Sequence, residues 1–168
     1  MNTRTKYGLT STVQSLALAM LLAVPGMSTA ADNFVPEAAG FEINNALSGT
    51  WYNPERSGEG FMLDVGNAGK IAVSFYTYDY YGNQVWLVGP GNVDGSVAVV
   101  DLYITEGGIY GAGFDKDLVT ESHWGSAVFT FTECATGSVE ILPDEEFLAE
   151  FEVMTTDITR LTVPINCD

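Results

Sequence analysis

The sequence predicts an all-β domain, a single antiparallel barrel or barrel-like meander, with a two-sheet β-sandwich as the alternative. Beyond residue 47, short runs rich in Val, Ile, Tyr, Phe and Thr are separated by clusters of Gly, Asn, Asp and Pro. Apolar and polar residues alternate within these runs, which gives each strand one buried face. We find no convincing long helix. Nine or so strands in one small domain must hide their edges, and closure into a barrel does this best.

Residues 32–46 lack periodicity and contain Pro36 and Gly40, so we expect an entry segment of loop or short turn. The clearest alternation lies at 61–65 and 71–75. Residues 66–69 and 81–83 are predicted hairpin turns, because glycine and asparagine tolerate the positive φ angles that such turns need. The expected strands are 47–52, 60–65, 70–78, 84–88, 96–105, 127–132, 138–142, 147–154 and 158–163.

The strand at 147–154 competes with a helix. Residues 143–146, Pro-Asp-Glu-Glu, resemble a helix start with proline and acids in the first turn. We favour a strand, because Phe147, Ala149, Phe151 and Val153 alternate with mostly polar residues and every neighbouring element is β.

A long segment at 106–123 contains four glycines with Tyr110 and Phe114 between them. At this length it is either a functional surface loop or a twisted strand with bulges. Asp115, Asp117 and Glu121 could hold calcium there, but they lack the full calcium-loop spacing, which favours a solvated acidic loop.

The N-terminus has the pattern of a secretory signal peptide. Arg4 and Lys6 precede an apolar run at 16–24, and the small residues 28–30 follow. The run is much shorter than the roughly 20 residues of a membrane-spanning helix. We therefore expect a signal peptide at 1–30, an entry segment at 31–46, an all-β domain at 47–168, and a secreted or periplasmic protein.

The chain is strongly acidic, with 6 basic and 22 acidic residues in 168 and a formal charge of −16. Removal of the expected leader with Arg4 and Lys6 would leave 4 basic against 22 acidic residues, a charge of −18. Such a surface repels phosphate backbones and anionic lipids. We expect no nucleic-acid partner and no membrane span; the expected partner is a small molecule, a glycan or a protein.

The only two cysteines are Cys134 and Cys167, and the expected compartment is oxidising. A disulfide between them is therefore predicted. It would close a loop of about 33 residues and stabilise the fold by roughly 3 to 4 kcal/mol. The alternative, a free nucleophilic thiol, needs a nearby base.

A composite motif runs through Ser48-Gly49-Thr50-Trp51-Tyr52-Asn53-Pro54, Ser57-Gly58-Glu59-Gly60-Phe61 and Tyr76-Thr77-Tyr78-Asp79, with Gly82 and Trp86 after it. With the Phe131–Cys134 and Thr159–Leu161 runs, it resembles a widespread group of exported proteobacterial proteins and C-terminal modules. The resemblance spans about 47–161 and implies export. It carries no catalytic or ligand-binding residues across.

The first strand, Gly-Thr-Trp-Tyr-Asn, also resembles the avidin and streptavidin group. That resemblance implies an antiparallel barrel in which Asn53 would point into a ligand cavity. The sequence departs from that group at residues 54–56, an insertion before Ser57, and the later tryptophan motifs that shape a biotin pocket have no counterpart that we can place.

Two interpretations of the 48–61 stretch stay open. In the structural one, Asn53 and Pro54 build a turn, Trp51, Tyr52 and Phe61 cap the core, and Arg56 pairs with Glu55 or Glu59. In the functional one, the stretch is the lip of a site with flat aromatic faces and polar orienting groups. The candidate ligand-binding residues are Trp51, Asn53, Tyr78, Asp79, Tyr80 and Trp86, with Tyr81 and Asn83 beside them.

Catalytic patterns are sparse. The single histidine, His123, rules out a multi-histidine zinc site, and neither a Cys-x-x-Cys spacing nor a Gly-x-Ser-x-Gly elbow occurs. We assign no catalytic residue, metal or cofactor. The leading hypothesis is a non-enzymatic binding module. The alternatives are a small polysaccharide hydrolase with an acid pair such as Glu59 and Asp79, and a structural or surface-assembly component.

Overall fold

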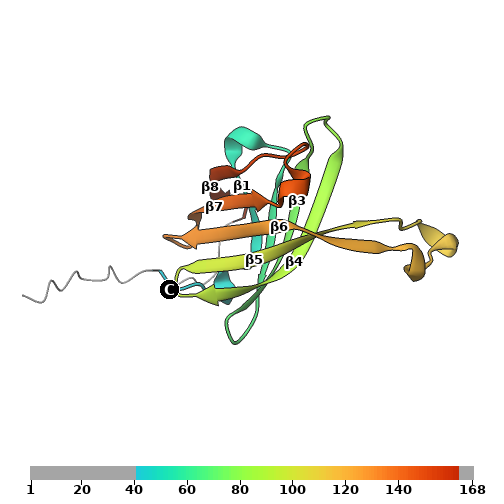
Figure 1. Cartoon of the computed structure of the whole chain (residues 1–168). Helices are drawn as coiled ribbons and strands as arrows, with labels where there is room; N and C mark the ends of the chain where they lie inside the picture. Colours follow the sequence, from blue (N-terminus) through green and yellow to red (C-terminus); the bar gives the residue numbers. More distant parts are fainter. Residues whose placement is uncertain (1–40, 163–168) are drawn as a thin grey trace, which may run out of the picture. The chain divides into compact units, whose positions relative to one another are not determined.

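The computed structural model describes residues 41–162 of the chain. They form a closed barrel in which each strand pairs antiparallel with its neighbour in sequence and β8 returns to pair with β1 (Figure 1). The predicted all-β barrel is confirmed. The strands are β1 (Gly49–Tyr52), β2 (Gly60–Val65), β3 (Lys70–Tyr78), β4 (Gln84–Asp94), β5 (Val97–Glu106), β6 (Thr120–Phe131), β7 (Thr136–Pro143) and β8 (Met154–Arg160).

The alternation predicted for β2 and β3 is present. Phe61, Leu63 and Val65 are buried on β2, and their register partners Phe75, Val73 and Ile71 are buried on β3. The predicted turn at 66–69 is also confirmed, with Ala68 and Gly69 in the left-handed region at φ 58° and 67°. These inward side chains belong to one apolar core that includes the rings of Trp51, Phe129 and Phe131.

Two strands are much longer than predicted, and β7 extends the predicted 138–142 slightly at both ends. β4 continues to Asp94 through a Gly-Pro-Gly segment that is typical of a strand end. A Cβ on Gly89 would lie 1.7 Å from the backbone oxygen of Asp101, so glycine allows β4 and β5 to approach closely there. β6 begins at Thr120, and with β5 it forms a hairpin that projects beyond the barrel (Figure 1). Its tip carries the short 3₁₀ helices η3 (Gly111–Gly113) and η4 (Lys116–Leu118).

The strand predicted at 147–154 is wrong. This segment contains the end of a 3₁₀ helix, η5 (Glu145–Phe147), a turn, and an irregular stretch before β8. Phe147 is half-buried and Phe151 is buried, but Ala149 and Val153 are exposed, so the apparent alternation does not mark a buried face. The helix-start pattern at 143–146 instead coincides with the start of η5. Of the strand predicted at 158–163, residues 158–160 belong to β8, 161–162 form a bend after it and 163 lies outside the described residues, so the described barrel has eight strands rather than nine.

The two ends of the barrel differ. A 3₁₀ helix, η1 (Asn45–Leu47), covers the end where β2 meets β3, and Leu47 is fully buried there. The backbone of Ile43 donates to Gly95 at this same end. At the other end, Phe147 and Phe151 of the connection between β7 and β8 pack against Trp124. The predicted signal peptide and residues 31–40 of the entry segment lie outside the described residues.

Candidate functional site at the barrel mouth

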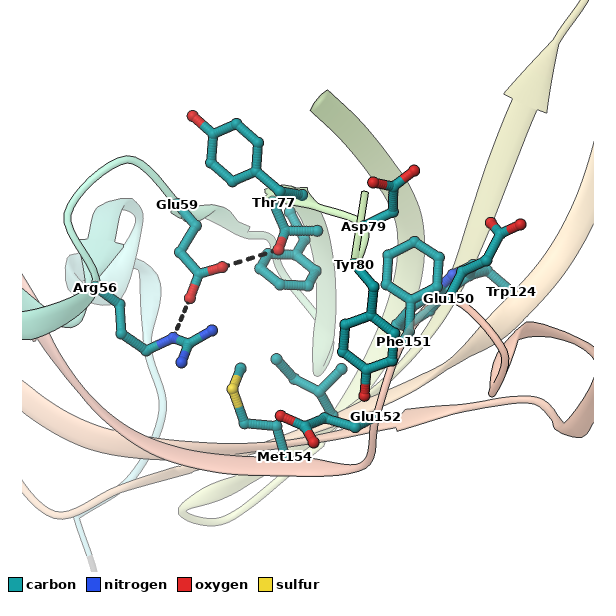
Figure 2. A pocket seen from close by; sticks show the side chains of 13 residues that line it. Arg56, Glu59, Thr77, Asp79, Tyr80, Trp124, Glu150, Phe151, Glu152 and Met154 are labelled. Carbon is teal, nitrogen blue, oxygen red and sulfur yellow. Dashed lines mark hydrogen bonds and ion pairs between the residues drawn. The ribbon is translucent and has the colours of Figure 1, made fainter. Parts of the chain in front are cut away.

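A pocket of about 250 Å³ lies at the barrel end opposite η1 (Figure 2). Four parts of the chain surround it: the mouth ends of β3, β6, β7 and β8, the η2 turn (Pro54–Arg56) with Glu59 after it, the β3–β4 turn at 79–80, and the connection at 150–152. The pocket therefore lies at the ends of these strands, between the connections that extend beyond them.

Aromatic side chains form the deep side of the pocket. Trp124 on β6 meets Phe151 edge to face, with ring centres 5.1 Å apart, and Phe75 on β3 also lines the space. Trp124 is only 1% exposed, and its indole N–H is buried with no hydrogen-bond partner among the described residues. A buried donor without an acceptor is costly, which makes this atom an unusual feature of the wall.

A polar chain forms the opposite wall. Glu59 accepts a hydrogen bond from the Thr77 hydroxyl at 2.9 Å through one oxygen and pairs with Arg56 through the other (Figure 2). The hydrogen bond to Glu59 raises the pKa of Arg56 above its usual value. Both oxygens of Glu59 are thus engaged within the protein. Thr77 is the buried polar residue of the β3 inward face.

The sequence around η2 explains how this wall is held. Asn53 accepts a hydrogen bond from the backbone of Glu55 at 2.8 Å, as expected of a helix-capping residue before proline. Gly60 starts β2 where a Cβ would lie 2.6 Å from the Trp51 carbonyl oxygen. The Asn-Pro and Gly-Phe parts of the motif therefore set the path of the chain on either side of Arg56 and Glu59.

The rim joins the β3–β4 hairpin to the β7–β8 connection. The backbone of Tyr80 donates to the carbonyl of Glu150 at 3.1 Å. The Tyr80 phenol interacts with the Glu152 carboxylate. The pKa of Tyr80 is raised, mainly because the phenol is partly desolvated and to a smaller extent because of the negative charge of Glu152. Figure 2 shows Tyr80 and Glu152 side by side at the rim of the pocket.

Asp79 lines the pocket, but both of its carboxylate oxygens accept hydrogen bonds within the β3–β4 turn. One oxygen accepts from the backbones of Tyr81 and Asn83, both at 2.8 Å, and the other accepts from the Asn83 side chain at 2.7 Å. The hydrogen bond from the Asn83 amide is the main reason that the pKa of Asp79 is lowered. Asp79 is consequently a poor general acid, because that role needs a raised pKa.

The six predicted site residues do not form one site. Tyr78, Asp79 and Tyr80 border the pocket, whereas Trp51 is fully buried in the core and offers no face to a ligand. The Asn53 amide donates to Thr156 at 2.7 Å. Trp86 lies opposite Tyr76 on β3 and lines a separate hollow of about 200 Å³ with Tyr76 and Tyr78.

Sequence reasoning missed several pocket residues. Trp124, Glu150, Phe151, Glu152 and Met154 were not predicted, although all line the pocket. Four of them lie in the 147–154 region that was assigned to a strand. The helix-start pattern at 143–146 was the signal that could have placed this segment as a connection over the barrel mouth.

His123 lies on β6 outside the pocket lining. Its Nδ1 donates to Asp144 at 2.6 Å, and its Nε2 lies 3.7 Å from Asp101. The hydrogen bond with Asp144 is the main cause that raises the pKa of His123. This side chain links β6 to β5 and to the connection that follows β7.

The acidic loop at the hairpin tip is held by local contacts: Asp115 caps the backbone of Asp117 at 2.9 Å, and Lys116 pairs with Asp117. No group of three or more His, Cys, Asp or Glu residues suited to a metal ion occurs within residues 41–162.

The described residues include no helix long and apolar enough to cross a membrane. Cys134 is not a free thiol, while Cys167 lies outside the described residues.

No family model, curated protein or solved structure matches the chain. The pocket itself is therefore the basis for the function proposed below.

Proposed function

We propose that the protein is an exported, non-enzymatic binding module whose barrel mouth holds a small ligand. The main support is the pocket of about 250 Å³, in which aromatic rings face carboxylates beside the unpaired indole N–H of Trp124. Apolar walls with a few polar groups are typical of ligand sites. The volume lies below the range of drug-sized ligands and suits a single sugar ring or a small amine.

Export is part of this proposal and rests on the leader pattern at 1–30. Expression with the intact N-terminus should yield a mature protein that begins near residue 31. Mass spectrometry of the product from the periplasm and the medium measures this. A protein that retains residues 1–30 would contradict export by a cleaved signal peptide.

Three tryptophans permit a direct test of the pocket, because each lies in a different environment. The Trp51 indole donates to the Leu47 carbonyl at 3.0 Å in the core, Trp86 is 54% exposed on the outer face, and Trp124 lines the pocket. A ¹⁵N NMR spectrum resolves one indole signal for each. We expect a ligand from a panel of sugars, amines and carboxylates to shift the Trp124 signal and leave the Trp51 signal in place.

Tyr80→Ala removes a rim side chain that is 60% exposed, so it should weaken binding without unfolding the barrel. Tyr110→Ala is the matched control, since this tyrosine is fully exposed at the hairpin tip. Equal binding by both variants, or a panel in which no compound moves the Trp124 signal, would contradict the proposal.

The acid-pair hydrolase is less well supported. Glu59 uses both oxygens within the protein, and the lowered pKa of Asp79 opposes a role as general acid. Turnover of a polysaccharide panel that disappears in Glu59→Gln would favour the hydrolase. Concentration-dependent self-association without any soluble ligand, measured by sedimentation, would favour a surface-assembly component.

A further inference from the structure

The charges around the mouth pocket are unbalanced. Four carboxylates line it, those of Glu59, Asp79, Glu150 and Glu152, against the single guanidinium of Arg56. Arg56 pairs with Glu59, so its charge is already compensated. The remaining negative charge repels an anionic ligand and attracts a cationic one.

Two of these carboxylates, Glu150 and Glu152, form no ion pair among residues 41–162, although Glu152 interacts with the Tyr80 phenol and lies within electrostatic reach of Arg56. Glu59 and Asp79 are engaged by Thr77, Arg56 and the β3–β4 turn. No ion pair reaches Glu150 or Glu152 from any residue between 41 and 162, and both side chains are exposed at the rim. Within residues 41–162 the rim thus carries two carboxylates without an ion-pair partner, and Glu150 also has no side-chain contact to a cation.

The aromatic walls favour the same kind of ligand. Tyr78, Tyr80, Phe151 and Trp124 line the space beside these carboxylates. Aromatic faces attract cations through the ring quadrupole, most strongly where water is displaced. An ammonium group can therefore contact a carboxylate and aromatic rings at the same time.

The indole of Trp124 adds a second requirement. Its buried N–H has no acceptor among the described residues, and Figure 2 shows the ring beside Phe151 and Glu150 at one side of the pocket. A cation cannot accept this hydrogen bond. A hydroxyl or carbonyl oxygen near the ammonium group can, once the side chains that cover this N–H shift to admit it.

We infer that the mouth pocket binds a small amine that carries a neutral hydrogen-bond acceptor, such as an amino sugar or an amino alcohol. This inference rests on the proposed function of the pocket and specifies its ligand class. The ammonium group lies against Glu150, Glu152 and the tyrosine rings, and the oxygen accepts from Trp124.

Two pairs of probes test this class. Glucosamine differs from glucose by an ammonium group in place of one hydroxyl, and choline differs from 3,3-dimethyl-1-butanol by its charge. We expect each amine to bind at least about tenfold more tightly than its neutral partner, with affinity that falls as salt rises. NMR titration that follows the Trp124 indole signal measures both affinity and position.

Glu150→Gln combined with Glu152→Gln should remove most of this preference, because both available charges are lost while the shape is kept. Glu140→Gln is the control, since Glu140 is exposed on β7 and does not line the pocket. Glucose and glucosamine that bind equally at Trp124 would overturn the amine inference and leave the proposed function intact. No shift of the Trp124 signal by any sugar, amine or carboxylate would overturn both.

Discussion

The guanidinium carbon of Arg160 lies 5.4 Å from the centre of the Trp51 ring, across the seam where β8 closes onto β1. Only two residue pairs form this seam in register. The Arg160 guanidinium adds hydrogen bonds to the backbone oxygens of Ala46 and Ser48, the second at 2.9 Å. One side chain therefore connects β8 to both β1 and the η1 plug.

Arg160→Ala should weaken this closure. The substitution leaves the carbonyl oxygens of Ala46 and Ser48 without their charged donor, and we expect the free energy of unfolding to fall by about 2 kcal/mol. Chemical denaturation measures the change. Lys70→Ala is the control, because the exposed Lys70 side chain forms a single surface hydrogen bond, to Asn92. A similar midpoint for both variants would contradict the role of Arg160.

Gly49→Ala should act through the same contact. Gly49 has φ 142°, and a Cβ there would lie 2.6 Å from Nη2 of Arg160. We expect destabilisation both from the strained backbone and from displacement of the guanidinium. In a double-mutant cycle, Gly49→Ala should cost less in the Arg160→Ala background than in the wild type. Strictly additive effects would show that Gly49 and Arg160 act independently.

His123 should make stability depend on pH. Its folded-state pKa is raised, mainly by the hydrogen bond with Asp144, with a smaller contribution from Asp101. The protonated form is thus favoured in the folded state. The added stability is fully present below the unfolded pKa of about 6.5 and is lost as pH rises through the folded pKa.

His123→Asn should remove this dependence, since His123 is the only histidine in the chain. Denaturant midpoints between about pH 5.5 and 8.5 cover the unfolded pKa. The wild type should lose stability toward the upper end of this range relative to the variant. We also expect Asp144→Asn to weaken the pH dependence more than Asp101→Asn, because the His123–Asp144 contact is shorter than the His123–Asp101 contact. A wild-type profile parallel to that of His123→Asn would contradict this assignment.

The projecting β5–β6 hairpin should be dispensable for folding. Every residue from 107 to 118 is exposed, including Tyr110 and Phe114, so the tip contributes no side chain to the core. Replacement of 108–118 by Asn-Gly should change the free energy of unfolding by less than about 1 kcal/mol. Phe151→Ala is the contrast, because this buried ring contacts Trp124 and its loss should cost about 3 kcal/mol. Loss of cooperative unfolding in the shortened chain would contradict the prediction.

The barrel was predictable because the sequence features that specify its strands and turns lie within short segments. Alternation at 61–65 and 71–75 specified one buried face per strand, and the glycines at 66–69 specified the turn between them. β4 and β6 were predicted too short because their ends depend on partners: β4 continues past Gly89 because it stays paired with β3 and β5, and glycine leaves room for the backbone of Asp101 there. Such long-range contacts leave little trace in the composition of one segment.

The candidate site was only partly predictable for a related reason. Trp51 and Trp86 are the same residue type, yet Trp51 is 0% exposed and Trp86 is 54% exposed. The difference follows from which face of its strand each occupies. The 48–61 stretch combines both roles considered for it, since Trp51 and Phe61 pack in the core while Arg56 and Glu59 form the pocket wall.

The predicted disulfide between Cys134 and Cys167 gives a final test. Cys134 follows β6, and a bond to Cys167 would tie the end of the chain to the turn before β7. Mass spectrometry of proteolytic fragments without reduction should find the two cysteines in one linked peptide. Cys134→Ser and Cys167→Ser should each lower the free energy of unfolding by roughly 3 to 4 kcal/mol, and the double variant by no more than either alone. Unlinked peptides from exported protein, or additive losses in the double variant, would contradict the bond.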